Sequence, residues 1–338
     1  MPLPLSVLDL VPLLRGSTST AALAASTALA QAVERFGYTR VWYAEHHNLP
    51  GIGATTPELM IAHVGAQTSR IRLGAGGVML PNHSPLKVAE SYRLLEALHP
   101  GRIDLGIGRA PGTDALTALA LRRSRQGLAA DDFVEQLAEL VAFGEGSLPS
   151  SHRFASIRAM PDDVPLPPVW LLGSGDFSAK LAAELGLGFA FAGHFSPEAP
   201  DAPMRVYRDR FIAKGTLTAP RAMLAVSVFC ADTEAAARRM ASSMLASFVE
   251  LRTGRPGRLS SPEEAIARTY TAEERAIAEF YGRLQIVGTP EQVRPRIEAL
   301  AARTGADEVM IATHSYDVAA RVRSFELVAQ SFGMARAA

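Results

Sequence analysis

RVWYAEHHNLP (residues 40–50) begins as an apolar run and ends in three titratable residues, Glu45, His46 and His47. A short run that is apolar throughout is typical of a strand in a parallel sheet, because such a sheet is buried on both faces. Comparable runs recur along the chain. They are LPLSVLDL (3–10), RIRLGAGGV (70–78), RIDLGIG (102–108), VWLLG (169–173), GFAFAG (188–193), AMLAVSVFC (222–230) and EVMIAT (308–313). With RVWYA (40–44) they make eight expected strands.

Segments with a helical period separate these runs. Apolar residues three or four positions apart form one stripe in each of four segments. The stripes are Leu29, Val33 and Phe36; Val88, Tyr92, Leu95 and Leu98; Phe133, Leu137 and Leu140; and Val293, Ile297 and Leu300. Alternating strands and helices over 338 residues predict an α/β fold, a (β/α)8 TIM barrel formed by residues 1–338 as a single domain. A doubly wound open sheet is the alternative.

Three stretches exceed ordinary loop length, and we interpret them as insertions in the barrel: 144–168, 194–220 and 254–290. Residues 254–285 are rich in Arg, Glu, Ser and Pro and follow the run that ends at Cys230. The segment cannot bury much surface alone, so its order must depend on contacts made elsewhere. Because it follows the seventh expected strand, we expect it to lie over the mouth of the barrel as a lid, with a plain surface insertion or an oligomer contact as the alternative.

The composition argues against several classes of partner. The formal net charge is +0 and the pI is about 7.1, so we expect no general attraction to nucleic acid or to an anionic membrane. No apolar run reaches the ~18 residues of a membrane span, and the start MPLPLSVLDL lacks the basic residues of a signal peptide. Cys230 is the single cysteine, which excludes a disulfide within the chain and favours a reducing cytoplasm.

Polar residues follow several of the expected strands, and in a TIM barrel the active site lies at the carboxyl ends of the strands. His46 and His47 follow the second run. Adjacent side chains of an extended segment point to opposite faces, so both histidines cannot ligate one metal without a bend, and we expect no metal site. A catalytic or substrate-orienting histidine is favoured over a pair of polar loop residues.

LLGSGDFSAKLAAELG (171–186) predicts an anion site. A strand ends at Gly173 and a helix begins near Asp176, so unpaired N–H groups and the helix dipole meet the ligand there. Gly175 allows close approach, and the hydroxyls of Ser174 and Ser178 add donors. A simple helix cap is the alternative. Arg109 (not on this stretch) follows the neighbouring expected strand and can add a positive charge.

Two glycine motifs lie near this face. GAGG (74–77) places glycine where a strand is usually strongest, which indicates either a ligand lying against the backbone or a barrel corner. GIGRAPG (106–112) has the spacing G-x-G-x-x-x-G with Pro111 inside it, so we do not interpret it as a dinucleotide-binding motif.

The chain resembles the luciferase-like flavin monooxygenases, in the branch nearest bacterial luciferase. The resemblance lies in motifs spread over most of the chain in the family's order. They are WYAEHHN (42–48), RIRLGAGGVMLPNHSPLKVAES (70–91), LHPGRIDLGIGRAPGTD (98–114), LLGSGDFSAKLAAELGLGFAFA (171–192) and VGTPEQV (287–293). It implies a (β/α)8 barrel in which reduced FMN reacts with O₂ and a small organic substrate, aldehyde-like or otherwise apolar, is oxidised. It also implies a mobile loop after the seventh strand.

The resemblance further assigns roles to individual residues. It implies acid–base chemistry at His46 with His47 as its neighbour, and a cis peptide at Gly76–Gly77 that supports the flavin ring. It implies a phosphate site at Ser174, Gly175 and Ser178, to which Arg109 contributes. This chain departs from luciferase at two of the positions that lie near the cofactor: it has Gly108 in place of a reactive cysteine, and Ser174 in place of an acidic residue. Light emission is therefore not expected.

Three functions stay open at this point. The first is an FMN-dependent monooxygenase, expected to be a homodimer, that receives reduced FMN from a separate flavin reductase. The second is an F420-dependent oxidoreductase that transfers hydride on the same barrel. The third is a non-catalytic flavin-binding partner subunit, against which the intact Glu45-His46-His47 motif argues.

Overall fold

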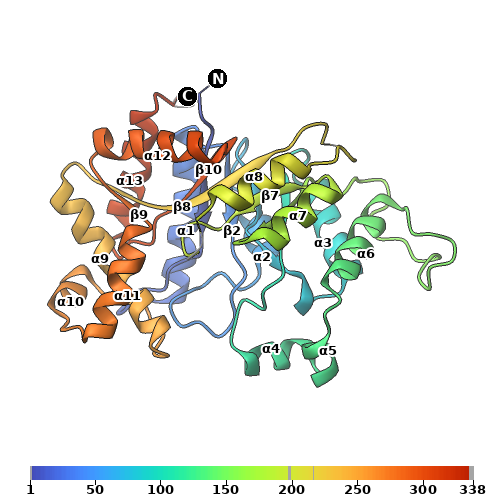
Figure 1. The fold of residues 1–338 in the computed structure, drawn as a ribbon, viewed down its shortest axis with the longest axis horizontal. Coiled ribbons are helices and arrows are strands. Elements are labelled where there is room, and N and C mark those ends of the chain that lie inside the picture. Colours follow the sequence, from blue (N-terminus) through green and yellow to red (C-terminus); the bar gives the residue numbers. More distant parts are fainter. Residues whose placement is uncertain (1, 197–198, 216, 335–338) are drawn as a thin grey trace.

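The computed structural model describes residues 2–196, 199–215 and 217–334, and its centre is a closed barrel of parallel strands (Figure 1). The barrel strands are β1 (Leu5–Asp9), β2 (Arg40–Tyr43), β3 (Arg72–Ala75) with its short continuation β4 (Val78–Met79), β5 (Ile103–Gly108), β6 (Val169–Gly173), β7 (Gly188–Phe191), β8 (Ala222–Cys230) and β10 (Glu308–Ala312). Pairing of β10 with both β1 and β8 closes the ring. The (β/α)8 prediction is confirmed, and the open sheet is excluded.

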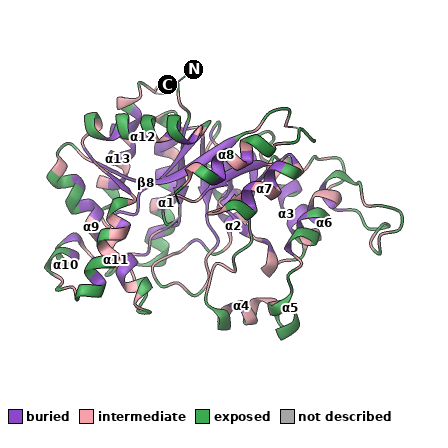
Figure 2. Cartoon of the chain, viewed as in Figure 1, coloured by how far each residue is buried: buried purple, intermediate pink, exposed green. Residues whose placement is uncertain are grey.

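Most of the helices surround the barrel, with buried inward faces and exposed outward faces, whereas α4 and α5 lie away from it and have one buried residue between them (Figure 2). They are α1 (Ser19–Arg35), α2 (Pro57–Gly65), α3 (Pro85–Leu98), α4 (Ala115–Arg122), α5 (Arg125–Ala129), α6 (Phe133–Glu145), α7 (Asp176–Leu185), α8 (Asp201–Arg210), α9 (Glu234–Arg252), α10 (Pro262–Ala267), α11 (Ala272–Arg283), α12 (Pro290–Thr304) and α13 (Val318–Ser331). The predicted stripes face inward, except that Leu98 is 58% exposed because α3 ends there.

The three expected insertions differ from one another. Residues 146–168 carry neither helix nor strand, whereas 194–220 contain α8. The third stretch contains α10, α11 and one strand that the sequence did not reveal, β9 (Gln285–Gly288). β9 pairs with the second half of β8, from Ser227 to Cys230, and β10 pairs with the first half, up to Ser227. Only Ile286 and Val287 of its four residues have large apolar side chains, so sequence reasoning absorbed the strand into the loop.

Residues 254–285 are ordered by contacts outside the segment, as expected. The ring of Tyr281 stacks on Phe248 of α9 with centroids 4.1 Å apart. Glu250 of α9 forms an ion pair with Arg268, with 3.0 Å between the nitrogen and the carboxylate oxygen. Leu259 exchanges backbone hydrogen bonds with Leu13 and Arg15, which follow β1. No residue of 254–285 lines the central cavity of the described structure, and closure of this segment as a lid stays a prediction.

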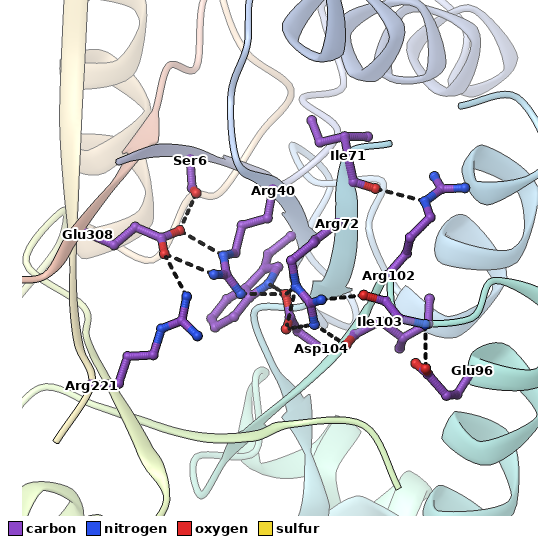
Figure 3. Close-up of polar contacts among 12 residues, drawn as sticks. Ser6, Arg40, Ile71, Arg72, Glu96, Arg102, Ile103, Asp104, Arg221 and Glu308 are labelled. Atoms are coloured by element: carbon purple, nitrogen blue, oxygen red, sulfur yellow. Dashed lines mark hydrogen bonds and ion pairs between the residues drawn. The ribbon is translucent and has the colours of Figure 1, made fainter. Parts of the chain in front are cut away.

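An ion cluster fills the amino end of the barrel (Figure 3). The guanidinium of Arg40, at the start of β2, donates to Asp104 at 2.6 Å and to Glu308 at 2.7 and 2.9 Å, and all three side chains are buried. Arg72 donates to the second Asp104 oxygen at 2.6 Å. The Arg40 guanidinium also lies 5.3 Å from the ring centroid of Trp170. The cluster links β2, β3, β5 and β10 beneath the cavity.

No helix among the described residues is both long and apolar enough to cross a bilayer.

Arg40→Met should destabilise the fold strongly. The substitution keeps the side chain's bulk but leaves Asp104 and Glu308 buried without their shared cation, and loss of one partner of a buried pair costs about 3–5 kcal/mol. Equilibrium denaturation in guanidinium chloride measures the change in the free energy of unfolding. Arg238→Met is the control, because its pair with Glu234 lies on the surface and should change stability little. Equal effects of the two substitutions would contradict the role of the cluster.

Candidate active site

A cavity of about 520 Å³ opens at the carboxyl ends of the strands. This volume falls within the range of about 300–1,000 Å³ that is usual for small-molecule sites. Its floor is apolar and includes Leu8, Trp42, Met223 and Met310 from four strands around the barrel. Of the predicted site residues, His46, Gly76, Arg109, Ser174, Gly175 and Ser178 line it. His47 and Gly77 do not.

His46 is held so that one ring nitrogen is free for chemistry. Its Nδ1 lies 3.2 Å from the carbonyl oxygen of Gly112. A carbonyl can only accept, so Nδ1 carries the proton of this hydrogen bond and Nε2 is the unprotonated nitrogen of the neutral ring. Burial lowers the pKa of His46 below its usual value, against the opposing effects of Gly112 and Glu45. A neutral imidazole with a free Nε2 can accept a proton near neutral pH.

Glu45 organises the loops around His46, a role that sequence reasoning did not assign to it although it placed Glu45 at this end of the barrel. Its carboxylate is buried, with His47 Nε2 at 2.9 Å and His83 Nε2 at 2.8 Å from Oε1. Oε2 accepts the backbone N–H of Met79 at 2.9 Å. His47 therefore turns away from the cavity, as the alternation of side chains predicts, and supports the site from behind.

The hydrogen bonds of Glu45 also shift the pKa values of the carboxylate and of one partner. Burial raises the pKa of Glu45, but its bonds to His83, His47 and Met79 outweigh this effect and bring the pKa below its usual value. Burial lowers the pKa of His83, but its hydrogen bond and charge interaction with Glu45 win and raise that pKa. Glu45 thus stays ionised and favours a protonated His83.

The start of α7 forms the opposite wall of the cavity. The N-cap is Gly175, and no side chain of the described residues caps this helix. Gly173 is required here because an added Cβ would lie 2.4 Å from the Ser178 side chain. Ser178 and the residues at the start of α7 before it line the cavity. An uncapped helix start beside a hydroxyl fits the predicted anion site better than a simple cap.

Arg109 and Asp176 add charge at this wall. The Arg109 guanidinium lies 4.2 Å from the ring centroid of Phe177, which places it at the helix start as predicted. Asp176 also lines the cavity, and its carboxylate lies 3.5 Å from Lys180. The acidic charge that is missing at Ser174 is therefore partly restored two residues later, with a lysine beside it.

Glycines shape the part of the cavity wall between His46 and the start of α7. The peptide between Gly76 and Gly77 is cis, as the resemblance implies. A Cβ on Gly77 would lie 2.8 Å from the carbonyl oxygen of Gly106, so neighbouring strand ends approach closely here. At Gly108 a Cβ would lie 2.9 Å from the end of the Met79 side chain. Met79 thus fills the space beside the position at which luciferase carries its cysteine.

GIGRAPG (106–112) covers the end of β5 and does not lead directly into a helix, which agrees with the rejection of a dinucleotide-binding motif.

Sequence reasoning missed two buried histidines, His194 after β7 and His314 after β10. His194 lines the cavity. Burial lowers the pKa of His194 to about 3 and that of His314 to about 4. Both follow an apolar run (GFAFAGH and EVMIATH), which is the pattern that drew attention to His46. Within the described ranges, no three His, Cys, Asp or Glu side chains are grouped so that they could hold a metal ion.

Comparison with known proteins identifies the family. A family model described as luciferase-like monooxygenase matches residues 5–308. A luciferase-like monooxygenase of Escherichia coli (strain K12) is 41% identical over 95% of this chain and 95% of that protein. An N-acetyl-S-alkylcysteine monooxygenase of Bacillus subtilis (strain 168) is 35% identical over 97% of each chain. The chain belongs to the luciferase-like monooxygenase family, and is thus an oxidoreductase by family.

Solved structures have the same fold as this chain. Apo-MsnO8 has a TM-score of 0.87 and 33% identity, with 99% of this chain and 100% of that chain covered. Two more distant structures show the shared fold alone. The oxygenating constituent of 3,6-diketocamphane monooxygenase of Pseudomonas putida, in complex with FMN, has 20% identity, a TM-score of 0.72 and coverage of 99% and 98%. An F420-dependent secondary alcohol dehydrogenase has 14% identity, a TM-score of 0.69 and coverage of 98% and 99%.

Glu45→Gln should lower the pKa of both His83 and His46, because Glu45 raises each of them. NMR titration of the imidazole signals measures both values. The contribution of His83 to stability, present in full below its unfolded pKa of ~6.5 and lost as pH rises through its raised folded pKa, should disappear in the variant. His63→Gln is the control, since it bonds Gln67 on the surface. Unchanged titration of His83 would contradict the pairing.

Proposed function

We propose that the protein is a flavin-dependent monooxygenase that uses reduced FMN and O₂ to oxidise a small, largely apolar organic substrate. The observation that carries the proposal is one cavity with an uncapped helix start on one side and a free His46 nitrogen on the other. The uncapped helix start suits a phosphate, and the free nitrogen of His46 suits proton transfer. The match to the luciferase-like monooxygenase family supports the same chemistry.

The residues present fit FMN. The N–H groups at the start of α7 and the Ser178 hydroxyl would hold the phosphate, with Arg109 nearby as the compensating cation. The glycine wall at Gly76–Gly77 leaves the backbone open to a flat ring. When bound, reduced FMN supplies the electrons with which O₂ is activated.

The chain itself supplies a base, its support and a dry cavity. His46 Nε2 would take or return a proton at the reacting atoms while the Gly112 carbonyl holds Nδ1. Glu45 fixes the loop that carries His46 by bonding His47 and the Met79 amide. The apolar floor limits water, which protects reactive oxygenated species from side reactions.

We also propose that reduced FMN comes from a separate flavin reductase, that the protein acts as a homodimer, and that residues 254–285 close over the cavity mouth. Parallel titrations with FMN and F420, followed by turnover assays with and without O₂, test the proposal as a whole. Tight binding of F420 in place of FMN, with turnover that needs no O₂, would replace it by hydride transfer. FMN binding without any turnover would leave a non-catalytic flavin-binding subunit.

Ser178→Asp should weaken FMN binding at least about tenfold, because it places a carboxylate beside the phosphate and removes a donor. Ser178→Asn is the matched control, similar in size but uncharged, and should weaken binding less. Quenching of FMN fluorescence gives both dissociation constants. Equal affinity of the Asp variant and the wild type would place the phosphate elsewhere.

His46→Ala should reduce turnover at least about tenfold, since general acid–base groups contribute ~10²–10⁴, with little change in FMN affinity. Turnover is measured with reduced FMN, O₂ and, as first substrates, N-acetyl-S-alkylcysteines and their uncharged amides, because a 35% identical relative is named for the former. His47→Gln should reduce turnover less, because its ring contacts Glu45 outside the cavity. Wild-type turnover in His46→Ala would remove this residue from the mechanism.

A further inference from the structure

The cavity wall is divided between two kinds of side chain. Around the ring the strands follow the order β1, β2, β3, β5, β6, β7, β8 and β10. Glycines, Arg109 and the start of α7 come from the ends of β3, β5 and β6. Histidines follow β7, β10 and β2, and they are His194, His314 and His46. His194 and His46 line the cavity, whereas His314 lies behind its wall. We call these three the histidine arc. The proposed function uses only His46 of the arc.

His194 and His314 are buried without hydrogen-bond partners. Their side chains are 9% and 5% exposed. Among the described residues, Nδ1 of His194 and both ring nitrogens of His314 have no partner. His194 lines the cavity, and its ring packs edge-on against Phe195 at 4.7 Å between centroids. These three nitrogens are closed to the cavity, so Nε2 of His194, the remaining ring nitrogen of the histidine that lines it, is the atom with which a ligand can form a hydrogen bond.

The charges around the arc keep its imidazoles neutral. Burial lowers the pKa of His194 and of His314, and mutual repulsion within the arc lowers both further. Asp9 and Arg321, which both act on His314, form a buried ion pair at 2.9 Å. Arg321 lowers the pKa of His314 and Asp9 raises it. Glu45 acts on His46, where burial still wins, while Arg109 and Asp176 lie on the far wall.

We propose that His194, backed by His314, hydrogen-bonds an uncharged polar group, such as an amide, hydroxyl or carbonyl, of an otherwise apolar substrate, and disfavours an organic anion at this end of the cavity. The inference deepens the proposed function and rests on it for the identification of the ligand as a substrate. His194 is thereby a residue that determines specificity.

The energetics decide between an uncharged group and a carboxylate. A carboxylate at the arc needs a protonated imidazole as its partner. With pKa values of about 3 and 4, His194 and His314 are almost wholly neutral at pH 7. To protonate either imidazole at pH 7, a ligand would have to raise its pKa by about three units or more. A buried carboxylate beside a neutral imidazole lacks a counter-charge. A neutral imidazole satisfies an uncharged partner at no such cost, as donor or as acceptor.

Calorimetric binding of octanamide and octanoate at pH 7, with n-butylbenzene as an apolar reference, tests the inference. Octanamide should bind more than about tenfold tighter than octanoate, with an affinity that is flat between pH 7 and 9 because the arc does not titrate there. His194→Phe should weaken octanamide about three- to tenfold and leave n-butylbenzene unchanged. His194→Asn should restore much of the octanamide affinity.

Octanoate binding as tight as octanamide, with proton uptake seen as a dependence of the heat on buffer, would overturn the proposal in favour of an anion site. An unchanged octanamide affinity in a folded His194→Phe variant would reduce His194 to a structural role. The same titrations are run with and without saturating FMN. Failure of FMN to bind would contradict the proposed function alone. Binding of FMN without a preference for octanamide over octanoate would contradict this inference alone.

Discussion

The guanidinium of Arg40 is shared by Asp104 and Glu308 inside the barrel, and it joins strands that are far apart in the sequence. β2, β5 and β10 meet at this one cation, with Arg72 adding a second cation to Asp104. A buried guanidinium is tolerable only when its donors are satisfied, so the geometry of the amino end is tightly specified. The apolar floor that includes Trp42 lies above it, and the cavity above that. The depth of the active site is thus limited by an ion cluster that takes no part in the chemistry.

A third buried carboxylate, Glu45, connects chain segments at the other end of the barrel. Glu45 binds His47, His83 and the Met79 amide, so the loops after β2 and β4 are fixed to one another. The adjacent His46 then needs only the Gly112 carbonyl to fix its tautomer. The site is therefore built from strand ends that a buried charge holds in register, while Nε2 of His46, the proposed base, has no partner within the described residues. This arrangement favours a preorganised base over one that forms when a ligand binds.

The barrel strands and the start of α7 could be predicted from the sequence, because burial and helix starts leave regular patterns of residue types. Strands that are buried on both faces leave apolar runs, as at AMLAVSVFC (222–230), and glycines beside a helix start leave LLGSGDF (171–177). The missing parts depend on contacts distant in sequence. β9 is four residues long and forms because β8 extends beyond its pairing with β10. The role of Glu45 depends on His83, which lies 38 residues away. His194 and His314 become neighbours of His46 only when the ring closes.

The central claim is that one cavity holds FMN between the start of α7 and His46. A crystal structure of the protein with FMN tests it most directly. The account predicts phosphate oxygens within hydrogen-bond distance of the backbone N–H groups at Gly175–Ser178 and of the Ser178 hydroxyl, with the flavin ring between the Gly76–Gly77 peptide and His46. A phosphate bound away from the start of α7, or a flavin outside the cavity, would contradict it.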